Sequence, residues 1–336
     1  MFGFVSDMMN NFRLLSLGLI FFLFFLTSYL YLQSQLTDLS HHLTITQATS
    51  RSNPPQPIVI YNRLPKTGST SLMNVLYELY DRNRFRVVQV HVTQYKHILT
   101  LADQVHLAEN ISSWSSTPTF YHGHFAYFDP RRVGVDVIPI FINLVRKPLD
   151  RLVSHYYFLR YGDDVLVNKV RAKEGDTTTF DECVEAGQPD CDPKKLWIQI
   201  PFFCGTAPQC WNPGSEWALS QAKHNLVSKY MLVGVTEELD SFVEVLEELI
   251  PRFFTGAKQF LEQSGKSHIK RTRHKDEVSE QTSHRMKSTK IWKLENEFYG
   301  FALRNFHSVK TTTLEQKRQK THFYNYEKVR PKYKES

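Results

Sequence analysis

The 336-residue chain is 41% hydrophobic and 13% aromatic, a composition that excludes a disordered or collagen-like protein and provides enough apolar side chains for a sizeable core. Its 41 Lys and Arg residues exceed its 34 Asp and Glu residues, which gives a formal net charge of +7. This excess favours a polyanionic partner over a neutral one, or it forms a solvated basic surface. Charge alone does not separate nucleic acid, lipid and acidic polysaccharide.

The N-terminal region contains an uncharged, strongly apolar run at residues 14–32. Its length is close to the ~20 residues that cross a bilayer as a helix, and it exceeds the roughly 7–15 apolar residues of a cleaved signal peptide. Residues 34–37 also make a poor cleavage site. We therefore predict a cytoplasmic tail at 1–13 and a transmembrane signal-anchor helix at 14–32. Residues 33–57, rich in Gln, Ser, Thr and Pro, predict a stem.

The remaining residues, 58–336, read as one folded domain with a basic C-terminal tail from about residue 310. Short apolar runs, rich in β-branched residues, predict buried strands at 58–61, 87–91, 119–121, 139–145 and 232–235. Helical spacing predicts helices at 72–80, 238–249 and 290–299, and Pro148 can open a further helix. Strands that alternate with helices predict an α/β fold in which a parallel sheet is flanked by helices.

The four cysteines lie close together, at Cys183, Cys191, Cys204 and Cys210. They allow three disulfide connectivities, of which nearest-neighbour pairing, Cys183–Cys191 and Cys204–Cys210, is the simplest. A zinc site is the alternative, but no Cys-x-x-Cys occurs and the spacings are wide. Disulfides imply an oxidising compartment. The acceptor tripeptide that begins at Asn110 agrees, because N-glycosylation requires a lumenal or extracellular domain.

The clearest chemical signal is the loop at residues 65–71, Pro-Lys-Thr-Gly-Ser-Thr-Ser, between a predicted strand and a predicted helix. A helix N-terminus binds phosphate through its backbone N–H groups, and Gly68 permits a close approach of the backbone. Lys66 adds a positive charge, and Ser69, Thr70 and Ser71 add hydroxyl donors. The lysine precedes the only glycine, so this is not a Walker A loop. A hydroxyl-rich helix cap without a ligand is the alternative.

Residues 61–71 resemble the 5′-phosphosulfate loop of Golgi sulfotransferases, and more narrowly that of the heparan sulfate 2-O-sulfotransferases. Further similar stretches follow in order, at 120–124, 142–146, 151–158, 199–205 and 232–239, so the resemblance runs from about residue 58 to 332. It implies a P-loop-like sulfotransferase fold. It also implies 3′-phosphoadenosine 5′-phosphosulfate (PAPS) as co-substrate without a metal, a type II Golgi membrane protein, and a homotrimer in which the C-terminal tail reaches a neighbour.

The resemblance also assigns residues. Lys66, Thr67, Gly68, Ser69, Thr70 and Ser71 would bind the phosphosulfate, and Lys66 would neutralise the leaving oxygen. Arg146 and Ser154 would bind the 3′-phosphate, a role that suits the planar guanidinium. His124 would be the general base and His122 an essential neighbour, because histidine titrates near neutral pH. Alternation along a strand would place both imidazoles on one face. A zinc-binding or structural His pair is the alternative.

Basic side chains are expected to bind the acceptor: Arg63 beside the loop, Arg171, and Lys270, where relatives tend to carry arginine and where Arg271 could substitute. The resemblance implies transfer to the 2-O position of hexuronic acid, preferably iduronic acid, in heparan sulfate. The alternatives are a uronyl 2-O-sulfotransferase acting on dermatan or chondroitin sulfate, an inactive glycan-binding membrane protein, and a nucleotide kinase. The assignment as a nucleotide kinase is disfavoured, because Lys66 is not at the position of the Walker lysine. We expect no nucleic-acid partner.

Overall fold

The computed structural model describes residues 25–31, 33–34, 56–92, 97–114, 116–163, 170–264, 272 and 274–320, with side chains as far as residue 315. The chain divides into two units, Met1–Pro55 and Gln56–Ser336. In the described part of the chain, no helix has both the length and the apolar character that a membrane span requires. The predicted tail, most of the predicted anchor and most of the predicted stem lie outside the described residues.

The second unit contains a sheet of five parallel strands in the order β2-β3-β1-β4-β5. The strands are β1 (Ile58–Asn62), β2 (Arg86–Gln89), β3 (Thr119–Gly123), β4 (Ile140–Val145) and β5 (Tyr230–Val235). Every residue of β1 and β3 is buried, as expected for strands covered on both faces. The predicted parallel sheet is therefore confirmed, and each predicted strand lies within two residues of an observed one.

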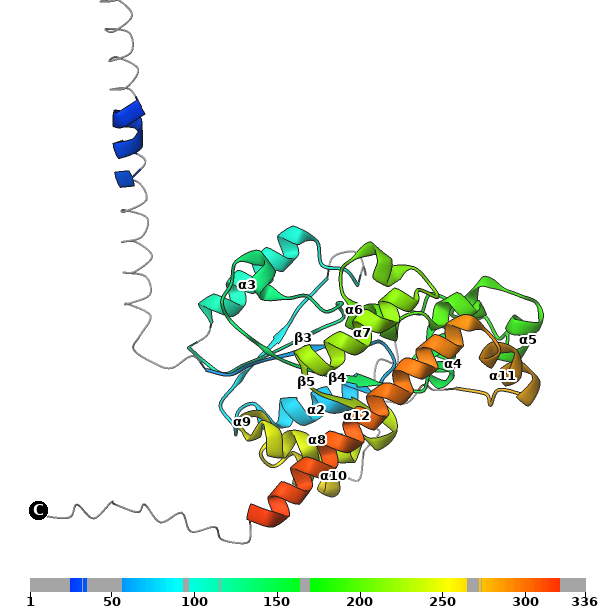
Figure 1. Cartoon of the computed structure of the whole chain (residues 1–336). Helices are drawn as coiled ribbons and strands as arrows, with labels where there is room; N and C mark the ends of the chain where they lie inside the picture. Colours follow the sequence, from blue (N-terminus) through cyan, green and yellow to red (C-terminus); the bar gives the residue numbers. More distant parts are fainter. Residues whose placement is uncertain are drawn as a thin grey trace, which may run out of the picture. The chain divides into compact units, whose positions relative to one another are not determined.

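Helices cover both faces of the sheet (Figure 1). Phe120 of β3 contacts Phe253 and Phe254 of α9 on one face, whereas the hydroxyl of Tyr121 reaches Asn110 of α3 on the other. Figure 1 shows α2 and α8 on the α9 side, and α6 and α7 on the α3 side. The helices are α2 (Ser69–Leu79), α3 (Leu101–Ser113), α4 (Pro148–Tyr161), α5 (Phe180–Glu185), α6 (Gln199–Cys204), α7 (Glu216–Lys229), α8 (Leu239–Leu249), α9 (Pro251–Phe254), α10 (Ala257–Ser264), α11 (Glu280–Lys287) and α12 (Lys290–Lys320).

Helix α12 is longer than its sequence pattern predicts, and the predicted tail from residue 310 is helical as far as Lys320. Leu294, Phe298, Ala302 and Phe306 recur every four residues and are all buried. This stripe packs α12 against β5, α7 and α8. Packing of one apolar face, rather than local propensity, supplies most of the stability of such a helix.

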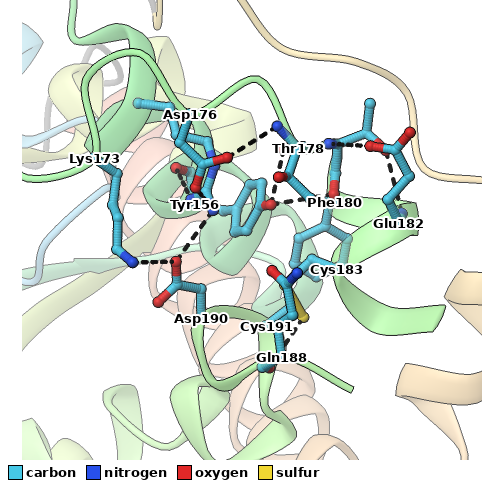
Figure 2. The surroundings of a disulfide bond; sticks show 12 residues. Tyr156, Lys173, Asp176, Thr178, Phe180, Glu182, Cys183, Gln188, Asp190 and Cys191 are labelled. Atoms are coloured by element: carbon cyan, nitrogen blue, oxygen red, sulfur yellow. Dashed lines mark hydrogen bonds and ion pairs between the residues drawn. A yellow bond between two sulfur atoms is a disulfide. The ribbon is translucent and has the colours of Figure 1, made fainter. Parts of the chain in front are cut away.

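Both predicted disulfides are present. Cys183–Cys191 joins α5 to the short helix that follows it (Figure 2), and Cys204–Cys210 closes a small loop after α6. Near the first disulfide, the fully buried guanidinium of Arg160 lies 2.7 Å from Asp176 and 3.1 Å from Asp190. These two ion pairs connect α4 with the segments on either side of α5.

Candidate active site

The loop at residues 63–68 leaves β1 in an unusual backbone conformation. Lys66 and Gly68 both have positive φ angles, 67° and 75°. Gly68 is the N-cap of α2 and has no side chain with which to cap it, so the first turn of the helix is open to an anion. A Cβ atom at Gly68 would lie 3.2 Å from Cγ2 of Thr236. The predicted order of strand, glycine-containing loop and helix is therefore confirmed, and phosphate binding by this loop stays a prediction.

A cavity of about 570 Å³ opens beside this loop. Its walls come from the carboxyl ends of β1, β3, β4 and β5 and from α4, and parallel sheets commonly bind ligands at that edge. The lining residues are Pro65, Lys66, Gly68, Ser69, Thr70, Ser71, His124, Arg146, Ser154, His155, Phe158, Thr236, Thr272 and Lys275. The volume is within the range of small-molecule sites.

Thr236, directly after β5, connects three strand ends. Its hydroxyl oxygen lies 2.8 Å from the carbonyl oxygen of Thr67 and 3.0 Å from that of Val145. The hydroxyl has one proton and donates it to one carbonyl at a time. Because the group is buried, these contacts hold the loop against the ends of β4 and β5.

Arg146 extends from the end of β4 into the cavity. Its Nη1 donates to the carbonyl oxygen of Lys66 at 3.2 Å, which joins the two cationic residues of the site. Burial lowers the pKa of Arg146, but an arginine remains charged at neutral pH. Ser154, two turns into α4 and buried, lines the same cavity. The structure thus brings together the pair that the sequence assigns to a second anion.

Lys66 is held beside the ring of Phe158, with Nζ 4.1 Å from the ring centroid and 3.5 Å from Oγ1 of Thr272. The aromatic face attracts the ammonium group without neutralising it. These contacts place the ammonium group at the wall of the cavity, next to the first turn of α2.

His124 presents one ring nitrogen to a fixed acceptor. Its Nδ1 lies 2.8 Å from the carbonyl oxygen of Arg63. A carbonyl only accepts, so Nδ1 carries the proton, and the neutral ring has its basic lone pair at Nε2. This is the tautomer that a general base with Nε2 as the proton acceptor requires.

His122 has a different environment. It is buried within β3, and its Nε2 lies 3.1 Å from the hydroxyl of Tyr77 on α2. Burial, followed by the nearby charges of Arg63 and His124, lowers the pKa of His122 to about 3. It does not line the cavity. We expected both imidazoles on one face of a strand. Strand β3 ends at Gly123, so His124 lies beyond it, and of the two histidines only His124 lines the cavity.

Of the residues predicted to bind the acceptor, Arg63 and Arg171 are described, and neither lines the cavity. Arg63 is half-buried, and burial lowers its pKa. The guanidinium of Arg171 lies 3.2 Å from the buried carboxylate of Asp163 and 4.7 Å from the centroid of the Phe158 ring. Lys270 and Arg271 lie outside the described residues. Asn110, the predicted glycosylation acceptor, lies in α3, where its Oδ1 accepts a hydrogen bond from Tyr121.

Several lining residues were not predicted from sequence. His155, Phe158 and Thr236 stand inside stretches 151–158 and 232–239, which carry the family resemblance, so that similarity could have indicated them. Burial lowers the pKa of His155 to about 4. Thr272 and Lys275 come from a polar segment without periodicity, which offers no such signal. Among the described residues, no group of three or more His, Cys, Asp and Glu side chains could hold a metal ion.

Comparison with known proteins identifies the family. The model of the sulfotransferase family matches residues 54–302. The chain is 50% identical over 276 residues to a Drosophila melanogaster protein named heparin sulfate O-sulfotransferase, covering 82% of this chain and 79% of that protein. It is 48% and 47% identical, over 280 residues and with the same coverage, to proteins of Xenopus laevis and Homo sapiens named heparan sulfate 2-O-sulfotransferase 1. With a match of this length and identity, the chain belongs to the sulfotransferase family.

Proposed function

We propose that this sulfotransferase transfers a sulfonate from PAPS to the 2-O position of hexuronic acid, preferably iduronic acid, in heparan sulfate. The observation that carries the proposal is the cavity shared by the loop at 65–71, Arg146 and His124. Relatives that are 47–48% identical carry the corresponding name. The retention of Lys66 and His124 at the cavity argues against an inactive glycan-binding protein.

The lining fits a ligand with two separated anionic groups. The first turn of α2 and Lys66 form one anion site, and Arg146 with Ser154 forms the other. PAPS carries a phosphosulfate at the 5′ position of its ribose and a phosphate at the 3′ position, and the phosphosulfate supplies the sulfonate. Hydrogen-bond donors on fixed main chain need no reorganisation as charge develops, so they stabilise the transition state effectively.

In the proposed transfer, His124 acts on the acceptor and Lys66 acts on the leaving group. Nε2 of His124 takes the proton from the sugar hydroxyl while the hydroxyl oxygen bonds to sulfur. The bond between sulfur and the phosphate oxygen breaks, and Lys66 neutralises the charge left on that oxygen. The cavity also aligns the two reactants, because transfer requires an in-line geometry.

The full-length chain, incubated with radiolabelled PAPS and separately with N-sulfated heparosan, heparan sulfate and dermatan sulfate, tests this function. Disaccharide analysis should place the label at the 2-O position of hexuronic acid in the first two acceptors. Label mainly in dermatan sulfate would instead support the uronyl 2-O-sulfotransferase. Absence of label in all three would overturn the enzyme assignment.

The location proposed for this activity is the Golgi lumen, with residues 14–32 as a type II anchor and the catalytic domain as a homotrimer. Two disulfides support an oxidising compartment. Protease treatment of sealed Golgi vesicles should leave the catalytic domain intact, and light scattering of the solubilised protein should give three copies. Digestion of the domain without detergent would contradict the orientation.

A further inference from the structure

The main chain of Arg146 is held by a buried side chain. Gln199, which is 0% exposed, accepts from the N–H of Arg146 at 2.9 Å and donates Nε2 to the carbonyl oxygen of Arg146 at 3.0 Å. A side-chain amide thus satisfies both polar main-chain groups of the residue that leaves β4. This fixes where the arginine side chain begins.

Glu295 of α12 in turn fixes the orientation of this amide. It is 0% exposed, and its Oε2 accepts from Nε2 of Gln199 at 3.3 Å. Its Oε1 accepts from the N–H groups of Ile198 and Ile200 at 3.0 and 3.2 Å. A carboxylate can only accept, so the Gln199 amide must turn its NH₂ group toward Glu295 and its oxygen toward the N–H of Arg146.

The charge on Glu295 is supported from several directions. Burial raises the pKa of Glu295 to about 7, while the buried guanidinium of Arg151 and the three N–H donors favour the carboxylate. An ionised group of this kind, in a fully buried position, destabilises a fold unless its hydrogen bonds are complete. Here Glu295 accepts three N–H bonds, and the one from Gln199 leads on to Arg146 of the cavity.

We propose that Gln199 and Glu295 are positioning residues for the nucleotide site. The chain of contacts runs from α12 through the start of α6 to Arg146, and from its guanidinium to the carbonyl oxygen of Lys66 at 3.2 Å. The inference rests on the proposed function, in which Arg146 binds the 3′-phosphate. Neither residue lines the cavity, so each acts through Arg146 and not on the nucleotide.

The test replaces Glu295 by glutamine in the full-length chain and measures nucleotide binding by calorimetry. The NH₂ group of the new amide would have to face either Nε2 of Gln199 or the N–H groups of Ile198 and Ile200. One of these sets of bonds is therefore lost, and the Gln199 amide loses part of its support. We expect Glu295→Gln to weaken binding of adenosine 3′,5′-bisphosphate about tenfold, the effect of roughly one hydrogen bond, and to leave adenosine 5′-phosphate within about twofold.

The matched control is Glu297→Gln, on the same helix, where the carboxylate is exposed and pairs with Lys223. It should change neither affinity. No loss in Glu295→Gln, or an equal loss for both nucleotides, would overturn the positioning role while leaving the proposed function intact. A wild-type chain that binds both nucleotides equally would contradict the assignment of Arg146 itself.

If circular dichroism shows that Glu295→Gln does not fold, Gln199→Met decides the same comparison. That variant leaves the bonds from Ile198 and Ile200 to Glu295 in place and removes the Gln199 amide, with its bonds to Arg146 and to Glu295. A loss confined to the 3′-phosphate supports the inference, and an equal or absent loss rejects it.

Discussion

At the scale of single residues, two neighbouring histidines differ in their access to the cavity and in their hydrogen-bond partners. His124 and His122 are two positions apart in sequence. His124 donates from Nδ1 to a main-chain carbonyl and lines the cavity, whereas His122 is buried against Tyr77. The carbonyl partner fixes the orientation of the His124 ring, and burial keeps the ring of His122 neutral and away from the cavity.

His124→Ala should reduce the transfer rate by ~10²–10⁴, the usual contribution of a general base, and leave binding of adenosine 3′,5′-bisphosphate near normal. The reason is that the imidazole acts on the acceptor proton and not on the nucleotide phosphates. Radiolabel transfer measures the first quantity and calorimetry the second. The exposed His106→Ala is the control. Loss of nucleotide affinity together with activity would indicate a structural role instead.

Residue identity could predict much of this site, but not all of it. Lys66 and Gly68 lie in a loop whose pattern indicates an anion site, and the family resemblance adds Arg146 at the end of a buried strand. Lys275 is one of many lysines in a polar segment, and only the fold brings it to the cavity. Glu295 resembles any surface glutamate of an amphipathic helix, and its burial follows from the packing of α12.

At the scale of elements, the turn from β1 into α2 depends on a glycine for two separate reasons. Gly68 has φ near +75°, which costs a residue with a side chain about 1 kcal/mol, and a Cβ there would crowd Thr236 at 3.2 Å. Thr236 is the residue that holds the loop to the ends of β4 and β5.

Gly68→Ala should therefore raise the KM for PAPS, by about tenfold or more, because the loop must shift away from Thr236. Gly134→Ala is the matched control, since Gly134 has φ near +83° and no atom within 4 Å of the added Cβ. In thermal unfolding, Gly134→Ala should show only the cost of the positive φ angle, and Gly68→Ala should lose at least that much stability. Equal KM values for the two would mean that contact with Thr236 does not shape the loop.

Elements with a strong pattern were predictable, and those defined by packing were not. Four of the strands are centred on apolar runs and β2 on the pair Val87 and Val88, so the sequence predicts all five to within about two residues. Helices α3 and α7 mix polar and apolar residues without a clear stripe, so their sequence pattern did not predict them. The order of strands in the sheet also has no local signal, because it is decided by which helices cover which face.

At the scale of the whole molecule, buried ionisable groups couple stability to pH. Burial, together with neighbouring cations, lowers the pKa of His122 to about 3 and that of His155 to about 4. For His155 these cations include Arg151 and Lys66. Burial raises the pKa of Glu295 to about 7. All three groups lie within the same unit. As the pH falls, the two histidines lower the stability of the fold and Glu295 raises it.

The free energy of unfolding should fall by about 1–2 kcal/mol between pH 7 and pH 5. In that window the unfolded chain binds protons at both histidines and the folded chain does not, which destabilises the fold as pH drops. Glu295 opposes this, because its folded carboxyl already binds a proton near pH 7 and its unfolded carboxyl does so only near 4.5. The loss of stability caused by the two histidines is therefore larger than the gain from Glu295.

Urea unfolding at pH 7, 6 and 5 measures this dependence in the wild type and in two variants. His155→Gln should flatten it, since one proton-binding site disappears from the unfolded chain, whereas His106→Gln, at an exposed position, should leave it unchanged. Glu295→Gln should steepen it, because the opposing group is removed. A free energy of unfolding that rises toward pH 5 in the wild type would contradict this prediction. It would show that proton binding by Glu295 outweighs that by the two histidines.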